Sequence, residues 1–269
     1  MTNLGTPTLI GIPFDGHSSY LRGAAEAPPK IRQAMACDAS NQWTEQGVDL
    51  GAPGLYDDAG DLVFSSEPAA FAVIEAALRD LLDQGKRPVS LGGDHSITFP
   101  IMKAMARSYP ELTIFHFDAH PDLYDEFEGN RFSHACPFAR IMEAGLAKRL
   151  VQVGIRTAAG HQREQAKRFG VEMIEMRDLP AYAKLKSSGS IYISFDIDVL
   201  DPAFAPGISH REPGGMSVRE AIAHLHAIEG TIVAADLVEY NPVQDVAGMT
   251  ATVTAKVLKE LLGKMISGR

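Results

Sequence analysis

Short apolar segments alternate with longer amphipathic segments along this 269-residue chain, and the alternation restricts the folds that it can adopt. The apolar segments are too brief for helices, are rich in β-branched residues, and are mostly followed by Gly, Asp or Pro. We predict buried strands at 8–13, 88–91, 112–117, 150–155, 171–174, 190–195 and 231–235. Helical spacing between them predicts helices at 68–83, 96–108, 137–144, 162–169, 217–228 and 249–265.

Strands that are apolar on both faces and alternate with helices form a parallel sheet with helices on both sides. We therefore predict an α/β fold, a three-layer α/β/α sandwich with a central, mostly parallel sheet. No repeat or Gly/Ser linker interrupts the pattern, so a single domain over 1–269 is expected. The stretch 37–60 has no clear pattern and is interpreted as a surface excursion.

Charge and cysteine content exclude several classes of function. The 34 Asp and Glu residues outnumber the 25 Lys and Arg residues, and the net charge of −9 repels phosphate backbones and anionic lipids. We expect neither a nucleic-acid partner nor a membrane partner. Cys37 and Cys136 are too few for a disulfide framework, and the first residues lack a basic stretch followed by an apolar run. A cytoplasmic protein is the expectation.

Polar side chains follow the predicted strand 112–117 at the point where it ends. Asp118, His120 and Asp122 alternate with other residues, and in extended backbone this spacing places them on one face. The carboxyl ends of parallel strands are the edge at which such sheets bind ligands. These three side chains are therefore candidate ligands of one site.

Two further strand ends supply residues of the same kind. The strand 190–195 continues into Asp196 and Asp198, again with alternate spacing, and the strand 88–91 continues through two glycines to His95. Because these ends meet at one edge of the sheet, we predict a shared metal site. Its candidate ligands are His95, Asp118, His120, Asp122, Asp196 and Asp198.

Four carboxylates and two imidazoles in one pocket indicate divalent metal ions. So many like charges a few ångströms apart repel one another unless cations offset them. Oxygen ligands with two imidazoles and no thiolate favour Mn²⁺, with Co²⁺ or Ni²⁺ as alternatives. The number of carboxylates predicts two ions per chain, and a pair of ions can lower the pKa of a shared water molecule and direct it at an electrophile. The expected chemistry is hydrolysis.

Other acidic and histidine residues receive simpler interpretations. Asp94 and Asp201 follow strands and are expected to cap a helix and to form a turn. A further group of histidines has no acidic neighbours at ligand spacing, so each is expected to be structural or solvated. This group contains His17, His116, His161, His224 and His226.

The three motifs together, in their order and spacing, resemble the signatures of the ureohydrolases, which include arginase, agmatinase and formimidoylglutamase. They are Gly92-Gly93-Asp94-His95-Ser96, Asp118-Ala119-His120-Pro121-Asp122, and Ser194-Phe195-Asp196-Ile197-Asp198 with Asp201-Pro202. The resemblance covers nearly the whole chain and is strongest to the arginases of plants, which share segments 128–130, 133–135, 206–210, 212–215 and 238–242. It implies an arginase-like sandwich.

The resemblance also implies an activity and roles for residues. The implied enzyme hydrolyses a guanidinium group to urea and an amine, uses manganese held by the six candidate ligands, and forms a homotrimer or homohexamer. Asp118 and Asp196 would bridge the two ions. By the same likeness, Glu239 would bind the guanidinium group, Asp122 would relay a proton to the leaving amine, and His134 would shuttle protons to and from solvent.

The substrate is less sharply indicated than the reaction. Asn130 and Arg131, in the loop 123–133, are candidate contacts for a substrate carboxylate, and His210 can reach the substrate tail. The overall likeness favours L-arginine, whereas the acidic residues of the same loop also suit agmatine. Guanidine and guanidinobutyrate stay as further alternatives.

Two hypotheses from other classes of protein are less well supported by the sequence. A deacetylase-like amide hydrolase would carry one zinc ion with a neighbouring pair of histidines, and an inert ligand-binding relative would lack a metal ligand. This chain has two acidic ligand pairs and a complete set. Metal analysis distinguishes the readings, since two Mn²⁺ ions support hydrolysis of a guanidino compound and one Zn²⁺ ion supports the deacetylase.

Overall fold

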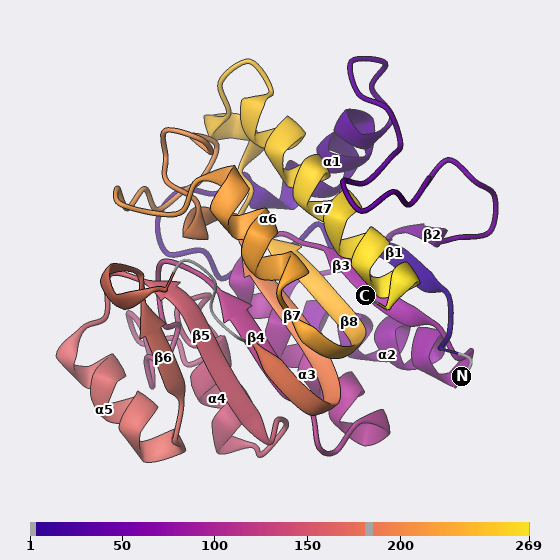
Figure 1. Ribbon diagram of the computed structural model, residues 1–269. Coiled ribbons are helices and arrows are strands. Elements are labelled where there is room, and N and C mark those ends of the chain that lie inside the picture. The colour runs from indigo at the N-terminus through magenta and orange to yellow at the C-terminus, as the bar shows by residue number, and fades with distance from the viewer. Residues whose placement is uncertain (1–3, 181–184, 269) are drawn as a thin grey trace.

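A parallel eight-stranded sheet forms the centre of the molecule in the computed structural model, which describes residues 4–180 and 185–268 (Figure 1). The strands run β2-β1-β3-β8-β7-β4-β5-β6 across the sheet, and every described pair is parallel. Their bounds are β1 Pro7–Gly11, β2 Asp57–Asp61, β3 Arg87–Leu91, β4 Thr113–Phe117, β5 Arg149–Ile155, β6 Glu172–Glu175, β7 Lys186–Asp196 and β8 Glu229–Val238. The sheet that the sequence predicts is confirmed.

Helices cover both faces of this sheet and complete the three layers (Figure 1). One face packs against α1 Ala27–Met35, α6 Val218–His226 and α7 Met249–Ser267. The other face packs against α2 Ala70–Asp83, α3 Thr98–Ser108, α4 Pro137–Glu143 and α5 Gly160–Phe169. Short 3-10 turns are η1 Ala24–Glu26, η2 Glu67–Ala69, η3 His95–Ile97, η4 Met176–Asp178, η5 Ile197–Val199 and η6 Pro242–Gln244. Among the described helices, none is long and apolar enough to cross a membrane.

All seven predicted strands are present, but the sequence missed an eighth. β2 lies at the end of the stretch 37–60 that was interpreted as a surface excursion, and it pairs with β1 at one edge of the sheet. It reads Asp-Asp-Ala-Gly-Asp and all five of its residues are exposed, so the apolar signal of a strand is absent. Arg32 from α1 holds this edge, because its guanidinium donates to Asp58 at 2.7 and 2.8 Å.

The single domain predicted over 1–269 reaches past the described part of the chain. Residues 1–3, 181–184 and 269 lie outside it. Helix α1 was also not predicted, since two prolines occupy its first turn and mask the helical pattern. The core fills both sides of the sheet, with Phe117 and Phe195 of neighbouring strands stacked at 5.4 Å between ring centroids.

The order of the strands decides where the functional residues lie. β3, β8, β7 and β4 are neighbours at the centre of the sheet, although β3 and β4 follow one another in the chain. These four strands are the ones whose carboxyl ends carry the predicted ligands and Glu239. The sheet therefore collects the six candidate ligands and Glu239 at one crevice, where the direction of chain progression reverses.

Gly93, in the turn after β3, allows the backbone to approach a neighbouring loop closely. A Cβ atom at this position would lie 1.7 Å from the carbonyl oxygen of Phe14, which accepts a hydrogen bond from the N–H of Asp94 at 2.9 Å. Any side chain here must push these two loops apart. The glycine in the first metal motif is therefore required by packing and not only by the turn.

We predict that Gly93→Ala lowers the free energy of unfolding by about 3 kcal/mol, because the added methyl group collides with fixed backbone. Chemical denaturation followed by circular dichroism measures this. Gly160→Ala is the matched control, since a Cβ atom at Gly160 would meet no atom within 4 Å. Equal stabilities of the two variants would contradict the close approach.

Candidate metal centre

The residues predicted as metal ligands converge just beyond the carboxyl ends of the four central strands. His95 lies in η3 after β3, and Asp118, His120 and Asp122 follow β4. The remaining two ligands close β7 and enter η5: Asp196 and Asp198. All but His120 have less than a tenth of their surface exposed, so the cluster is buried at the base of the crevice.

The hydrogen bonds behind His95 show which of its nitrogen atoms carries a proton. Ser194 Oγ donates to Asp236 Oδ1 at 2.7 Å, so it has no proton left for His95 Nε2, which lies 2.9 Å away. His95 Nε2–H must therefore donate to Ser194. In the neutral ring this leaves a lone pair on Nδ1, the atom that faces the other ligands.

Three carboxylates surround this lone pair. His95 Nδ1 lies 3.2 Å from Asp118, 3.1 Å from Asp122 and 3.2 Å from Asp196, each distance being to Oδ2. Nδ1 is fully buried and has no hydrogen-bond partner among the described residues. Burial lowers the pKa of His95, but the three carboxylates outweigh it and raise the pKa well above its usual value. A buried lone pair among carboxylate oxygens is an environment that fits a metal cation.

A second group of ligands adjoins the first. His120 Nδ1 lies 2.9 Å from Asp198 Oδ2 and 3.4 Å from Asp118 Oδ1. The Asp118 carboxylate therefore directs one oxygen toward each histidine, as a bridging ligand would. Among the described residues, two neighbouring groups could each hold a metal ion, and Asp118 belongs to both groups.

Backbone N–H groups fix the orientation of three of the carboxylates. Asp196 Oδ1 accepts from the N–H of Asp198 at 2.7 Å, Asp198 Oδ1 from that of Ala119 at 3.0 Å, and Asp118 Oδ1 from that of His120 at 2.5 Å. In Asp196 and Asp198, the other oxygen is the one that faces a histidine. The short loops after β4 and β7 thus orient the site before any ion enters.

The carboxylates repel one another where they meet. Burial raises the pKa of Asp196, and the charges of Asp198 and Asp118 raise it further, well above its usual value. The pKa of Asp198 is raised by burial and by Asp118. Cations in the site would reduce this repulsion. The arrangement of charges and the unpartnered His95 Nδ1 therefore both indicate that the cluster suits metal cations.

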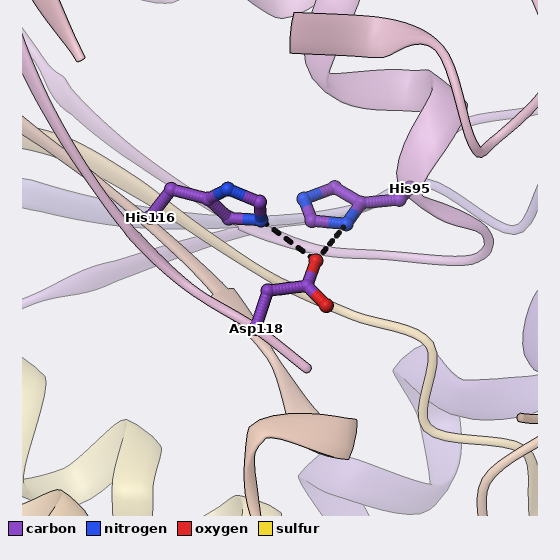
Figure 2. Close-up of side chains that lie close together, drawn as sticks. All are labelled: His95, His116 and Asp118. Atoms are coloured by element: carbon purple, nitrogen blue, oxygen red, sulfur yellow. Dashed lines mark hydrogen bonds and ion pairs between the residues drawn. The ribbon is translucent and has the colours of Figure 1, made fainter. Parts of the chain in front are cut away.

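His116 contributes to the site although the sequence analysis gave it no role. Figure 2 shows it opposite His95, with both rings reaching the same oxygen of Asp118. His116 Nε2 lies 2.7 Å from Asp118 Oδ2, and its Nδ1 accepts from the Gln152 amide at 3.0 Å. Its ring also stacks on Phe138 at 3.8 Å between centroids. His116 therefore orients Asp118, and its position two residues before this ligand on the same face of β4 was the available signal.

A cavity of about 100 Å³ opens above the cluster. Glu239 lines it from the end of β8, and its Oε1 accepts hydrogen bonds from the backbone N–H of His95 at 2.9 Å and from His134 Nδ1 at 2.8 Å. The negative charge of Glu239 thus lies beside the ligands without belonging to them. The full lining is Ser19, His120, Asp122, Phe127, His134, Ala135, Asp196, Asp198, His210 and Glu239.

Two of these residues hold unusual backbone conformations. Asp122 has a φ of 50° and Glu239 a φ of 62°, both in the left-handed region that side chains other than glycine rarely adopt. Such conformations cost energy and persist where the surroundings impose them, most often at functional sites. The fold therefore supports these two side chains at some cost in stability.

The loop residues expected to contact a substrate carboxylate do not line this cavity. Arg131 pairs with Asp125 at 3.2 Å and with Glu143 at 2.9 Å, and it is an exposed residue. Asn130 bonds to His17 Nδ1 at 2.9 Å. The polar groups of both residues are thus engaged within the loop and its immediate neighbours.

His210, the third residue expected to reach the substrate tail, does line the cavity. Its ring centroid lies 5.1 Å from that of His134, 6.0 Å from that of His120 and 5.7 Å from that of Tyr20. His210 therefore stands at the rim between the ligand cluster and the surface. Ser19, which the sequence analysis missed, lines the same wall; it belongs to no motif, so nothing in the sequence marked it.

The two acidic residues expected to have local roles have them. Asp94 caps η3 by accepting from the N–H of Ser96 at 3.1 Å. Asp201 accepts from the N–H groups of Ala203 at 2.9 Å and Gly214 at 2.6 Å, and so holds a turn. Both predictions are confirmed.

Comparisons with known proteins agree with this geometry. Residues 6–263 match the arginase family. The mitochondrial arginase of Medicago truncatula is 46% identical over 97% of this chain and 82% of that protein, and an agmatinase of Bacillus anthracis is 34% identical over 94% and 90%. A solved structure of arginase from Medicago truncatula superimposes with a TM-score of 0.92, covering 97% of this chain and 88% of that one.

The parallel sheet, with its histidine and aspartate cluster at the carboxyl edge, defines a ureohydrolase, as the three sequence motifs predicted. The chain belongs to the arginase family. Its resemblance to plant arginases is also confirmed.

We predict that Asp196→Asn loses bound divalent metal while Asp201→Asn keeps it, because Asp196 faces the orphaned His95 nitrogen and Asp201 only holds a turn. Elemental analysis after dialysis against Mn²⁺ measures the metal. For the unaltered protein, Mn²⁺ at 100 times its Kd should stabilise folding by about 2.7 kcal/mol for each bound ion, and Asp196→Asn should lose most of this gain. Equal metal in both variants would contradict the assigned site.

Proposed function

We propose that this protein hydrolyses L-arginine to L-ornithine and urea. The observation that carries the proposal is the position of Glu239, a buried carboxylate that lines the cavity directly beside the ligand cluster. A guanidinium group is a planar cation that pairs well with a carboxylate, and here the paired carbon would lie next to the metal centre. The likeness to proteins named arginase supports arginine as the substrate.

The proposed cofactor is a pair of Mn²⁺ ions, with Co²⁺ or Ni²⁺ as alternatives, because the candidate ligands are oxygen atoms and imidazoles without thiolate. We propose that six residues hold the ions: His95, Asp118, His120, Asp122, Asp196 and Asp198. When bound, the ions would activate a water molecule for attack on the guanidinium carbon.

Glu239 would orient the substrate. Within the described residues, both hydrogen bonds to its carboxylate fall on Oε1, so Oε2 is the oxygen that can accept from a guanidinium N–H. Burial raises the pKa of Glu239, but His134 and the N–H of His95 outweigh it and lower the pKa below its usual value, so the group is ionised at neutral pH. Fixing the carbon in this way supplies the geometry that attack requires.

Asp122 and His134 would move protons. Asp122 lines the cavity beside Glu239 and would pass a proton to the nitrogen that leaves, and His134, a buried residue of the same lining, would pass protons between the cavity and solvent. His134 also supports Glu239 directly, since the two are 2.8 Å apart. The carboxylate, the histidine and Asp122 would act as one unit around the scissile bond.

The substrate tail would extend toward His210, which lines the cavity rim. Asn130 and Arg131 stay proposed carboxylate contacts, and Arg131 would have to exchange its partners Asp125 and Glu143 for the substrate. Agmatine is the second candidate, because the described lining contains four carboxylates and neither Lys nor Arg, which suits a substrate without a carboxylate.

We predict that the protein loaded with Mn²⁺ releases urea faster from L-arginine than from agmatine, guanidine or 4-guanidinobutyrate at equal concentration. A colorimetric urea assay measures this. Preference for agmatine would replace the proposed substrate and leave the reaction standing, whereas absence of urea from all four compounds would contradict the proposed function.

We also predict that Glu239→Gln keeps its bound metal and loses turnover by about 1000-fold, because the neutral amide no longer pairs with the guanidinium charge. Elemental analysis and urea release measure the two effects on the same sample. Near-normal turnover in this variant would refute the role of Glu239.

His134→Asn should be milder, with a loss of about 100-fold, since buffer can replace part of a proton shuttle but not a substrate contact. Its metal content should equal that of the unaltered protein. Loss of metal in His134→Asn would mean that the residue is a ligand and not a shuttle.

A further inference from the structure

A segment near the N-terminus, residues 17–21, contributes Ser19 to the cavity lining and is not used by the proposed reaction. It follows β1 and reaches across to the loop that carries His134. Within it, Ser19 lines the cavity and makes two contacts to the His134 ring. These contacts determine how His134 is held.

Ser19, His134 and Glu239 form a continuous chain of hydrogen bonds. Ser19 Oγ lies 2.8 Å from His134 Nε2, and the backbone nitrogen of Ser19 lies 3.2 Å from the same atom. On the other side of the ring, His134 Nδ1 lies 2.8 Å from Glu239 Oε1. Both nitrogen atoms of the imidazole are therefore engaged, one by Ser19 and one by the carboxylate.

The donors in this chain fix the tautomer of His134. An unprotonated imidazole nitrogen offers one lone pair. The Ser19 hydroxyl, 2.8 Å from Nε2, is the nearer donor to this lone pair, and the backbone N–H at 3.2 Å is the weaker one, so the hydroxyl is the main donor to Nε2. An ionised carboxylate can only accept a hydrogen bond, so Nδ1 must carry a proton and donate to Glu239. His134 is held with its basic lone pair on Nε2, toward Ser19 and the cavity.

The segment is anchored at several points, so Ser19 is not free to move away. The N–H of His17 donates to Asp94 Oδ2 at 2.9 Å, and the N–H of His134 donates to the carbonyl of His17 at 3.2 Å. At the other end, Ser209 Oγ donates to the carbonyl of Leu21 at 2.9 Å. The fold thus places Ser19 against His134 through three separate loops.

In the absence of cations, the charges around His134 favour the protonated ring over this neutral tautomer. Burial lowers the pKa of His134, but the nearby carboxylate of Glu239, with Asp94 and Asp122, raises it to about 9. Bound cations beside Asp122 would offset part of this negative charge. The Ser19 donors then also favour the neutral ring, because a proton on Nε2 would face these donors and could not accept a hydrogen bond from them.

We propose that Ser19 is a positioning residue for His134: its hydroxyl favours the tautomer that carries the proton on Nδ1, against Glu239, and leaves the proton-accepting lone pair on Nε2, at the cavity wall that Ser19 lines. This role rests on the proposed function of His134 as a proton shuttle. The proposed role requires no bond from Ser19 to the substrate or to the metal ligands. Its effect on turnover passes entirely through the histidine.

Steady-state kinetics of the Mn²⁺-loaded variants test the proposal. Ser19→Ala should lower kcat for urea release about tenfold, the effect of losing one hydrogen bond in the transition state, with KM and metal content unchanged. Ser18→Ala is the matched control, since its hydroxyl bonds to Asp94 and not to His134. An unchanged kcat in Ser19→Ala, or a rise in KM alone, would overturn the proposal.

A double-mutant cycle separates action through His134 from direct action on the substrate. In the His134→Asn background, Ser19→Ala should have no further effect on kcat, because the group through which it acts is already absent. Multiplicative losses in the double variant would show an independent role for Ser19 and would refute the proposal.

A spectroscopic readout keeps the inference testable if the protein releases no urea, an outcome that would contradict the proposed function alone. In histidine-¹⁵N spectra of the full chain, without metal and with diamagnetic Zn²⁺, the resonances absent from His134→Asn identify His134. With Zn²⁺ they should show a single neutral tautomer protonated on Nδ1, and Ser19→Ala should show a mixture or a protonated ring. An unaltered tautomer in Ser19→Ala would overturn the role of the hydroxyl.

Discussion

Buried carboxylates gathered around one histidine nitrogen are the constraint on which the rest of this structure depends. The lone pair of His95 Nδ1 faces three carboxylate oxygens at 3.1 to 3.2 Å, and no described residue offers it a hydrogen bond. Such an assembly is unfavourable in a protein interior unless cations occupy its centre. The surrounding parts of the fold have the common effect of keeping these groups together until a cation binds.

That support comes from outside the ligand set. Ser194 and the buried Asp236 fix the proton of His95 on Nε2. His116 holds Asp118 through a hydrogen bond to Oδ2. Asp236 also accepts a hydrogen bond from Tyr192 at 2.5 Å, so both of its carboxylate oxygen atoms have hydrogen-bond donors in the core. The site is thus a layered arrangement in which each ligand is oriented by a second residue, and this precision is what a small, rigid substrate group requires.

Local patterns in the sequence predicted a large part of both fold and site. Seven strands were predicted correctly, and the six residues predicted as ligands lie together in the structure, because an apolar run or an alternation of Asp and His depends only on neighbouring residues. β2 escaped because its residues are exposed and no apolar run marks them, and Ser19 escaped because its contact with His134 joins residues 115 positions apart. Periodicity reports which side chains are buried and cannot report long-range partners.

The sequence by itself determined that the chain forms a sandwich around a mostly parallel sheet and that its strand ends carry histidine and aspartate residues that could hold metal, since spacing, side-chain chemistry and the likeness to ureohydrolases are all properties of the sequence. Only the tertiary structure decided that β8 and β7 insert between β3 and β4, which brings Glu239 and Asp196 between His95 and Asp118. It also decided that the segment around Ser19 closes over His134. The free energy of strand pairing depends on packing across the whole sheet, so the pattern of any one segment cannot predict which strands become neighbours.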